Sequence, residues 1–102
     1  MHLVQLFLPL RDDNGRAFDK ALFGEVRAAL AERFGGSTAF VRSPAAGLWE
    51  DPAGTLERDD VVLVEVQVDA LDPAWWRDYR STLEQRFQQD AILVRALPAE
   101  ML

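Results

Sequence analysis

Residues 60–69, DVVLVEVQVD, limit the possible fold of this chain more than any other stretch. Valine occupies every second position from Val62 to Val68, and the positions between them hold Leu63, Glu65 and Gln67. Because successive side chains of a β-strand point to opposite faces, the alternation predicts a strand with one wholly apolar face and one mixed face. The apolar face must be covered by other elements, and the mixed face is available for a separate role.

Five further segments have patterns that predict regular structure. Alternating apolar residues predict strands at residues 2–10, 37–43 and 91–97. One helix is predicted over residues 18–34, before Gly35-Gly36, and a second after the Asp72-Pro73 pair, which suits a helix start. The stripes that these helices are predicted to bury are Phe18, Leu22, Val26, Ala29, Leu30 and Phe34 in the first and Trp76, Tyr79, Leu83 and Phe87 in the second.

The resulting order, βαββαβ, suggests an α+β fold of the ferredoxin-like sandwich type. In that topology a four-stranded antiparallel sheet of order 4-1-3-2 carries two helices on one face and leaves the other face open. The chain has 102 residues, 49% of them apolar, which is enough for one compact domain over residues 1–102 and too few for two.

Residues 43–60, SPAAGLWEDPAGTLERDD, lie between the second and third predicted strands. Pro44 is expected to break the outgoing strand, because proline cannot donate a hydrogen bond to a neighbouring strand. Asp51-Pro52-Ala53-Gly54 fits a type I turn, so the segment is predicted to form an extended hairpin arm. Trp49 can cover either the edge of its own domain or a second subunit, and the second subunit is favoured because indole side chains are common interface anchors.

If the valine face of residues 62–68 meets the helices, the open face collects a mixture of apolar and polar side chains. These are Leu3, Gln5, Phe7, Leu63, Glu65, Gln67, Leu93 and Arg95, with Phe40 and Arg42 as further candidates. Leu3, Phe7, Leu63 and Leu93 would form an apolar patch larger than a stable monomer usually exposes. The patch predicts a homodimer that joins two open faces into a dimeric α/β barrel, with these four residues and Trp49 as candidate interface residues.

The polar residues of the same face, Gln5, Glu65, Gln67 and Arg95, are the candidate ligand-binding residues. Glu65 and Arg95 are expected to meet across Gln5, and two interpretations stay open. One is a structural ion pair inside the dimer. The other is a small-molecule pocket, in which Arg95 binds a carboxylate or phenolate and Glu65 or His2 moves a proton.

Composition argues against several classes of partner. The formal net charge of −6 repels phosphate backbones and anionic lipid surfaces, so neither nucleic acid nor membrane is an expected partner. RNA stacking on the sheet is also not expected, since Phe7 is the only suitable aromatic residue. There is no cysteine and His2 is the only histidine, so no metal site and no cofactor are expected. The acidic pairs Asp12-Asp13 and Asp59-Asp60 are better explained by turn chemistry than by a cation. The N-terminus lacks the pattern of a signal peptide, and a cytoplasmic protein is expected.

Three segments resemble a group of small bacterial proteins that have a predicted ferredoxin-like fold and no established activity. They are ERFGGSTAFVRSPAAGLW, RDDVVLVEVQV and WWRDYRSTLEQRFQQDAILVRAL, and their most specific parts are Gly47-x-Trp49 and Phe87-x-Gln89-x-x-Ile92. The resemblance implies the fold and supplies no catalytic residues. The arrangement is more distantly similar to antibiotic-biosynthesis-type monooxygenases and stress-responsive α/β-barrel proteins, without matching their residue patterns.

Two functions follow as hypotheses. The first is a non-enzymatic homodimer that binds a small ligand or a protein. The second is a cofactor-free enzyme of the monooxygenase or isomerase type, with a pocket between the sheet and the partner subunit.

Overall fold

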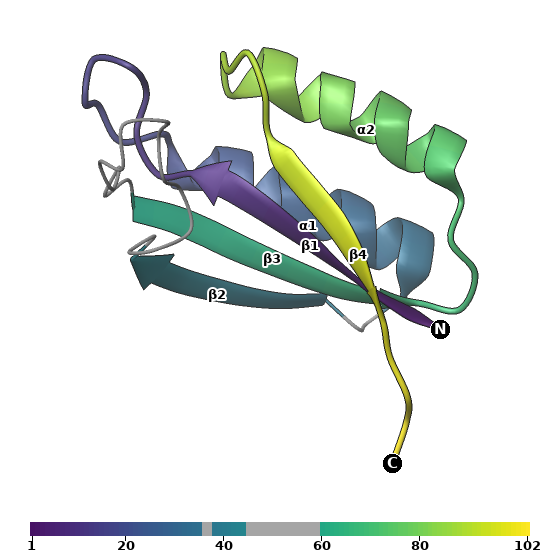
Figure 1. The fold of residues 1–102 in the computed structure, drawn as a ribbon. Coiled ribbons are helices and arrows are strands. Elements are labelled where there is room, and N and C mark those ends of the chain that lie inside the picture. The colour runs from purple at the N-terminus through teal and green to yellow at the C-terminus, as the bar shows by residue number, and fades with distance from the viewer. Residues whose placement is uncertain (36–37, 45–59) are drawn as a thin grey trace, which may run out of the picture.

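The computed structural model describes residues 1–35, 38–44 and 60–102 (Figure 1). Its elements follow in the order β1 (His2–Pro9), α1 (Lys20–Phe34), β2 (Thr38–Pro44), β3 (Asp60–Val68), α2 (Pro73–Arg86) and β4 (Leu93–Pro98). The β-branched valines of β3 suit an extended backbone, whose pleated surface they pack well. The class of the fold is therefore α+β.

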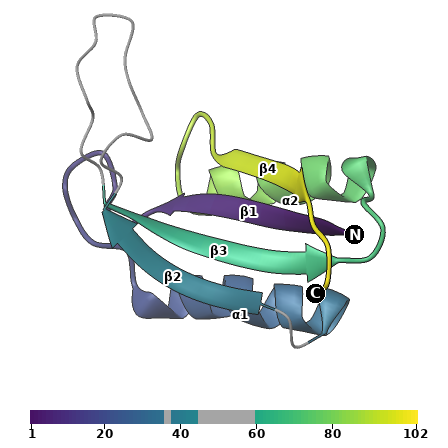
Figure 2. The ribbon, with the colours of Figure 1, turned by 60° about the horizontal axis from the view of Figure 1, so that its bottom comes forward.

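The four strands form one antiparallel sheet in the order β2-β3-β1-β4, which is 4-1-3-2 when read from β4. The central pair, β1 and β3, is in register from His2 opposite Val68 to Pro9 opposite Val61. Figure 2 shows both helices on one side of the sheet, with the strands in front of them. The side of the sheet away from the helices is called the open face below.

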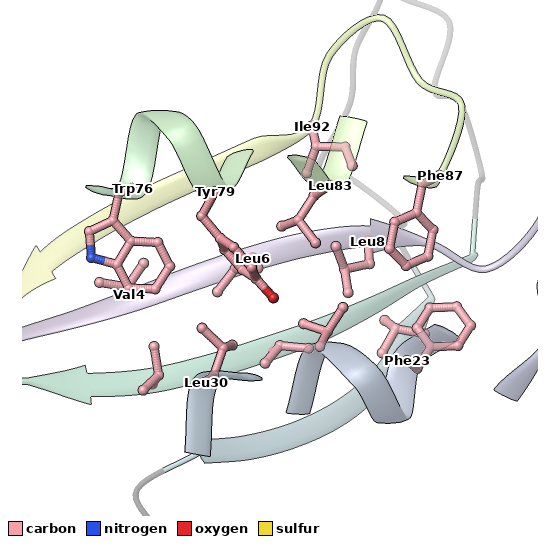
Figure 3. Packing of buried hydrophobic residues seen from close by; sticks show 14 of the residues in the cluster. Val4, Leu6, Leu8, Phe23, Leu30, Trp76, Tyr79, Leu83, Phe87 and Ile92 are labelled. Carbon is pink, nitrogen blue, oxygen red and sulfur yellow. The ribbon is translucent and has the colours of Figure 1, made fainter. Parts of the chain in front are cut away.

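The main core lies between the sheet and the two helices. The valines at 62, 64, 66 and 68 all point into it, as do Val4, Leu6 and Leu8 of β1. The helices contribute the buried residues Phe23, Val26, Leu30, Trp76, Tyr79 and Leu83, and Phe87 and Ile92 close the far end (Figure 3). Burying one large apolar side chain stabilises the fold by about 1.5–3 kcal/mol, so this layer is the main source of stability.

The first helix begins two residues later than its apolar stripe predicts. Asp19 is the N-cap, and its carboxylate accepts a hydrogen bond from the backbone N–H of Ala21 at 3.0 Å. Phe18 precedes the helix and packs edge-on against the ring of Phe87. The predicted stripe omits Phe23, which is buried, but its members Val26 and Leu30 are buried as expected. Its other members, Phe18, Leu22, Ala29 and Phe34, pack against the same core.

Two of the differences between the expected and the observed strand boundaries have a direct physical cause. Strand β2 includes Pro44, which pairs with Asp60 as the last residue of the strand. Proline is tolerated there because β2 is an edge strand with a neighbour on one side only. Strand β4 begins at Leu93 rather than Ala91, because the N–H of Ile92 donates to the side chain of Glu84 at 3.0 Å and so is not available to the sheet.

The expected description of the fold is corrected in its finer part. What the structure supports is the α+β class with the boundaries given above. The βαββαβ order does not by itself establish the ferredoxin-like name. The predicted hairpin arm, with its type I turn at residues 51–54, lies outside the described residues.

Candidate functional site

Three polar residues lie side by side on the open face, one on each of three neighbouring strands. Gln5 of β1 is in register with Glu65 of β3 on one side and with Arg95 of β4 on the other. Cross-strand partners point to the same face of a sheet, so the three side chains form a line across it. This line, Glu65–Gln5–Arg95, is called the polar row.

Hydrogen bonds join the polar row. Arg95 donates from Nε to Oε1 of Gln5 at 2.7 Å, and Gln5 donates from Nε2 to Oε2 of Glu65 at 3.4 Å. The neutral amide thus lies between a cation and an anion whose strands, β4 and β3, are two strand spacings, about 10 Å, apart. The expected meeting of Glu65 and Arg95 takes place through Gln5.

The two ends of the polar row keep hydrogen-bonding capacity. Glu65 is half-buried and uses one carboxylate oxygen, whereas Arg95 is exposed and uses Nε, which leaves its two terminal nitrogens available within the described part of the chain. The Arg95 guanidinium also lies over the ring of Phe7, 5.2 Å from the ring centre. Such a contact fixes the guanidinium plane and leaves its outer edge for a carboxylate.

The apolar residues near the polar row are less exposed than the sequence suggested. Phe7 and Val61 are each only 4% exposed and form a small second cluster, against which Leu63 and Leu93 pack. Leu3 is half-buried at the other end of β1. Phe7 therefore adds little accessible surface to the expected patch, while Leu3, Leu63 and Leu93 are partly accessible.

Gln67 stands apart from the polar row. Its amide nitrogen lies 2.7 Å from the sulfur of Met1 and 3.3 Å from that of Met101, so it meets the two chain ends. It also borders a groove of about 350 Å³ that Arg33 and Asp69 line. Of the four candidate ligand-binding residues, the structure brings together Gln5, Glu65 and Arg95.

Three other sequence-based candidates are placed elsewhere. His2 is in register with Val68, on the side of the helices, so it cannot move a proton at the polar row. Its buried Nδ1 has no hydrogen-bond partner within the described part of the chain. Phe40 and Arg42 of β2 are in register with Val64 and Val62 of β3, whereas the residue of β2 in register with Glu65 is Ala39.

Turn chemistry accounts for Asp12, as expected. Its carboxylate accepts hydrogen bonds from the backbone N–H groups of Asn14 and Arg16, each at 2.9 Å, and Gly15 takes a positive φ of 82° in the same turn. Among residues 1–35, 38–44 and 60–102 no group of three or more His, Cys, Asp or Glu side chains could hold a metal ion. Asp59 and Trp49 lie outside the described residues.

The tryptophan pair belongs to an aromatic cluster at the start of α2. Trp76 is buried as expected, and Trp75 stacks on Tyr79 with ring centres 5.0 Å apart. Sequence reasoning missed Arg33, whose guanidinium lies 5.1 Å from the centre of the Trp75 ring and 4.0 Å from Asp72. No local pattern marks this contact, because it joins the end of α1 to the start of α2.

The motif Phe87-x-Gln89-x-x-Ile92 has a structural explanation. Phe87 and Ile92 are core residues, and Gln89 donates from its side chain to the carbonyl of Phe87 at 3.0 Å. Gln88 between them adopts a positive φ of 52°, which ends the helix sharply. The motif therefore forms the turn between α2 and β4.

The sequence matches no protein-family model, and no curated protein shows significant similarity to it. The resemblance to a group of small bacterial proteins therefore gains no family name. No helix in the described part of the chain is long and apolar enough to cross a membrane.

Two solved structures of a phage SAM lyase are similar to this chain in fold. The structure in complex with S-methyl-5'-thioadenosine has a TM-score of 0.59 and 14% sequence identity, over 94% of this chain and 79% of the lyase chain. The apo structure has a TM-score of 0.57 and 15% identity, over 94% and 78%. At this identity the likeness concerns the fold alone.

Proposed function

We propose that this protein binds a small zwitterionic molecule on the open face of the sheet, with a second copy of the chain covering the bound molecule. The observation that carries the proposal is the polar row, in which Gln5 holds Arg95 and Glu65 at a fixed separation. Arg95 would bind a carboxylate of the ligand, and Glu65 would bind a cationic group.

The chemistry of the solved lyase supports this class of ligand. S-adenosylmethionine carries a carboxylate and two cationic groups, an ammonium and a sulfonium, within one flexible molecule. A phage enzyme of similar fold acts on it, as the name SAM lyase says, and was solved with S-methyl-5'-thioadenosine bound. The similar fold makes adenosyl thioethers and sulfonium compounds the first ligands to test on this chain.

A second copy is part of the proposal because the polar row lies on a flat strand surface. Small-molecule sites bury most of the surface of their ligand, which one open sheet face does not do. Leu3, Leu63 and Leu93 are the accessible apolar residues that a partner would cover beside the polar row, and Trp49 stays a candidate interface residue.

A cofactor-free enzyme at the same site is the second candidate. The similarity to a lyase favours it, and the unused oxygen of Glu65 could accept a proton from a bound substrate. Binding without turnover would separate the first candidate from the second.

Titration calorimetry with S-adenosylmethionine, S-methyl-5'-thioadenosine and methionine tests the binding site. We expect Arg95→Met to weaken binding of the carboxylate-bearing ligands about tenfold or more, since a charge-assisted hydrogen bond contributes about 1.5–3 kcal/mol. Glu65→Gln should weaken binding of the sulfonium compound, S-adenosylmethionine, more than binding of the neutral thioether, S-methyl-5'-thioadenosine. Arg77→Met and Glu25→Gln remove exposed charges of the same kinds from the helices and should leave affinity unchanged.

Chromatography of the same mixtures tests turnover. Release of S-methyl-5'-thioadenosine from S-adenosylmethionine, abolished by Glu65→Gln even at S-adenosylmethionine concentrations that saturate the variant, would support the enzyme. Equal binding by all variants, or no binding by the wild type, would overturn the proposed site.

A further inference from the structure

A groove of about 410 Å³ lies beside the start of α1, away from the polar row. Leu10, Phe18, Phe23 and Val62 form its apolar floor, where the end of β1 and the start of β3 meet the helix. Figure 3 shows Phe23 close to Phe87 at this end of the core. The volume falls within the range of about 300–1,000 Å³ that small-molecule sites occupy.

The rim of the groove is basic, although the chain as a whole is acidic. Arg11, Lys20 and Arg27 line it, and no acidic side chain of the described residues does. Two carboxylates of the adjoining loop form hydrogen bonds with the backbone. Asp12 accepts from the N–H groups of Asn14 and Arg16, and Asp19 accepts from the N–H of Ala21 as the helix N-cap. In a chain of net charge −6, the cations Arg11 and Lys20 at the rim of one apolar groove favour an anion there.

Lys20 stands where the helix itself disfavours a cation. It is the first residue of α1, directly after the Asp19 N-cap, and no acidic residue follows it in the first turn. The exposed N–H groups of a helix start carry partial positive charge, so a lysine there repels them. The helix start is capped by the Asp19 carboxylate, and the exposed Lys20 ammonium beside it is the group that an anion entering this end of the groove would meet.

Gly24 keeps the middle of the groove open. It lies one turn after Lys20 on the same side of α1, and a Cβ atom added to it would meet nothing within 4 Å. Glycine is a poor helix former, and no packing contact requires it here. The absence of a side chain at Gly24 therefore leaves space in the groove, and it is not needed for packing of the core.

We infer that this groove binds an acyl carboxylate of medium chain length, with the carboxylate at Arg11 and Lys20 and the chain lying over Gly24 on the apolar floor. Charge complementarity selects the anionic head, and the four apolar floor residues select the tail. The inference is independent of the polar row and of the proposed function.

Fluorescence or NMR titration with decanoate tests the inference, with 1-decanol as the neutral ligand of the same chain length. We expect saturable decanoate binding below about 1 mM and at least tenfold weaker binding of decanol. Lys20→Gln should reduce decanoate affinity about tenfold and leave decanol affinity unchanged, whereas Arg80→Gln on α2 should change neither.

A pair of leucine substitutions tests the position of the chain. Gly24→Leu fills the space above the helix and should abolish decanoate binding, while Ala28→Leu adds the same side chain at an exposed position outside the groove and should not. Gly24→Leu raises the helix propensity and Ala28→Leu lowers it only slightly, so folding is retained. The inference would be overturned by equal affinity for decanoate and decanol, or by equal decanoate binding of the two leucine variants. Binding of inorganic phosphate to a protein that does not bind decanoate would overturn it as well.

Discussion

Gln5 shows how one neutral residue organises two charges. A direct ion pair needs the charged atoms within 4 Å, but Glu65 and Arg95 stand on strands separated by β1, and the Gln5 amide both accepts from one and donates to the other. This contact could be predicted from the sequence, because alternation places all three residues on one face. The role of the polar row in binding stays a proposal.

Replacing Gln5 by leucine removes both hydrogen bonds of the polar row at nearly constant volume. We expect the free energy of unfolding to fall by less than about 1 kcal/mol, because water can solvate the half-buried Glu65 and the exposed Arg95. The Arg95 Nε–H should exchange faster with solvent in the variant. Nitrogen-15 NMR of arginine Nε groups measures this, and unchanged exchange would show that Gln5 does not hold Arg95.

Tyr79 carries a buried hydroxyl that has no hydrogen-bond partner among the residues that the structure describes. Burial raises the pKa of this phenol above its ordinary value, and the charge of Arg86 lowers it to a smaller extent. The folded state therefore retains the proton at a pH where the unfolded chain has begun to lose it. The associated stability is fully present below about pH 10, the pKa of an unfolded tyrosine, and is lost as the pH rises through the folded pKa.

Tyr79 is the only tyrosine of the chain, so its ionisation can be followed directly by ultraviolet absorbance. We expect a midpoint above pH 10 in the folded protein. Tyr79→Phe should be at least as stable as the wild type at pH 7, since it removes an unpartnered hydroxyl. It should also lose less stability between pH 9 and pH 11. A midpoint at or below 10 would contradict the burial that the structure gives this side chain.

At the scale of elements, the start of α2 could be predicted from the sequence more accurately than the start of α1. The Asp72-Pro73 start of α2 was predicted and is confirmed, because Asp72 accepts from the N–H of Trp75 and Pro73 opens the helix. The start of α1 was predicted too early, because Phe18 fits the apolar period. The Asp19 cap, a single hydrogen bond, decides the boundary, and periodicity alone does not report it.

Asp72 combines two interactions that substitutions can separate. Asp72→Ala removes both the N-cap and the ion pair with Arg33, and we expect a loss of about 1 kcal/mol in the free energy of unfolding. Asp72→Asn keeps a capping oxygen and should lose less than about 0.5 kcal/mol, because exposed ion pairs contribute little. Urea unfolding of both variants measures the difference, and equal losses would assign the stability to the ion pair instead.

At the scale of the whole molecule, the two faces of the sheet were predictable to different degrees. The valine alternation identifies the helix-covered face without ambiguity, since all four valines are buried there. The open face depends on tertiary detail: Phe7 is buried against Val61, and the chain ends approach Gln67. Neither arrangement leaves a local signal, because each joins segments far apart in the sequence.

The proposed association of two open faces gives a prediction for the molecule as a whole. Leu63→Glu places a charge beside Phe7 on the open face, where a second copy would have to bury it, at a cost of several kcal/mol. We expect light scattering to show a dimer for the wild type at micromolar concentration and a monomer for this variant. Leu71→Glu is the matched control, because Leu71 is 37% exposed in the connection between β3 and α2, away from the open face. Circular dichroism should show both variants folded. A wild-type monomer, or the same oligomeric state for both variants, would mean that the open face does not join two copies, and the ligand would then have to bind to one sheet alone.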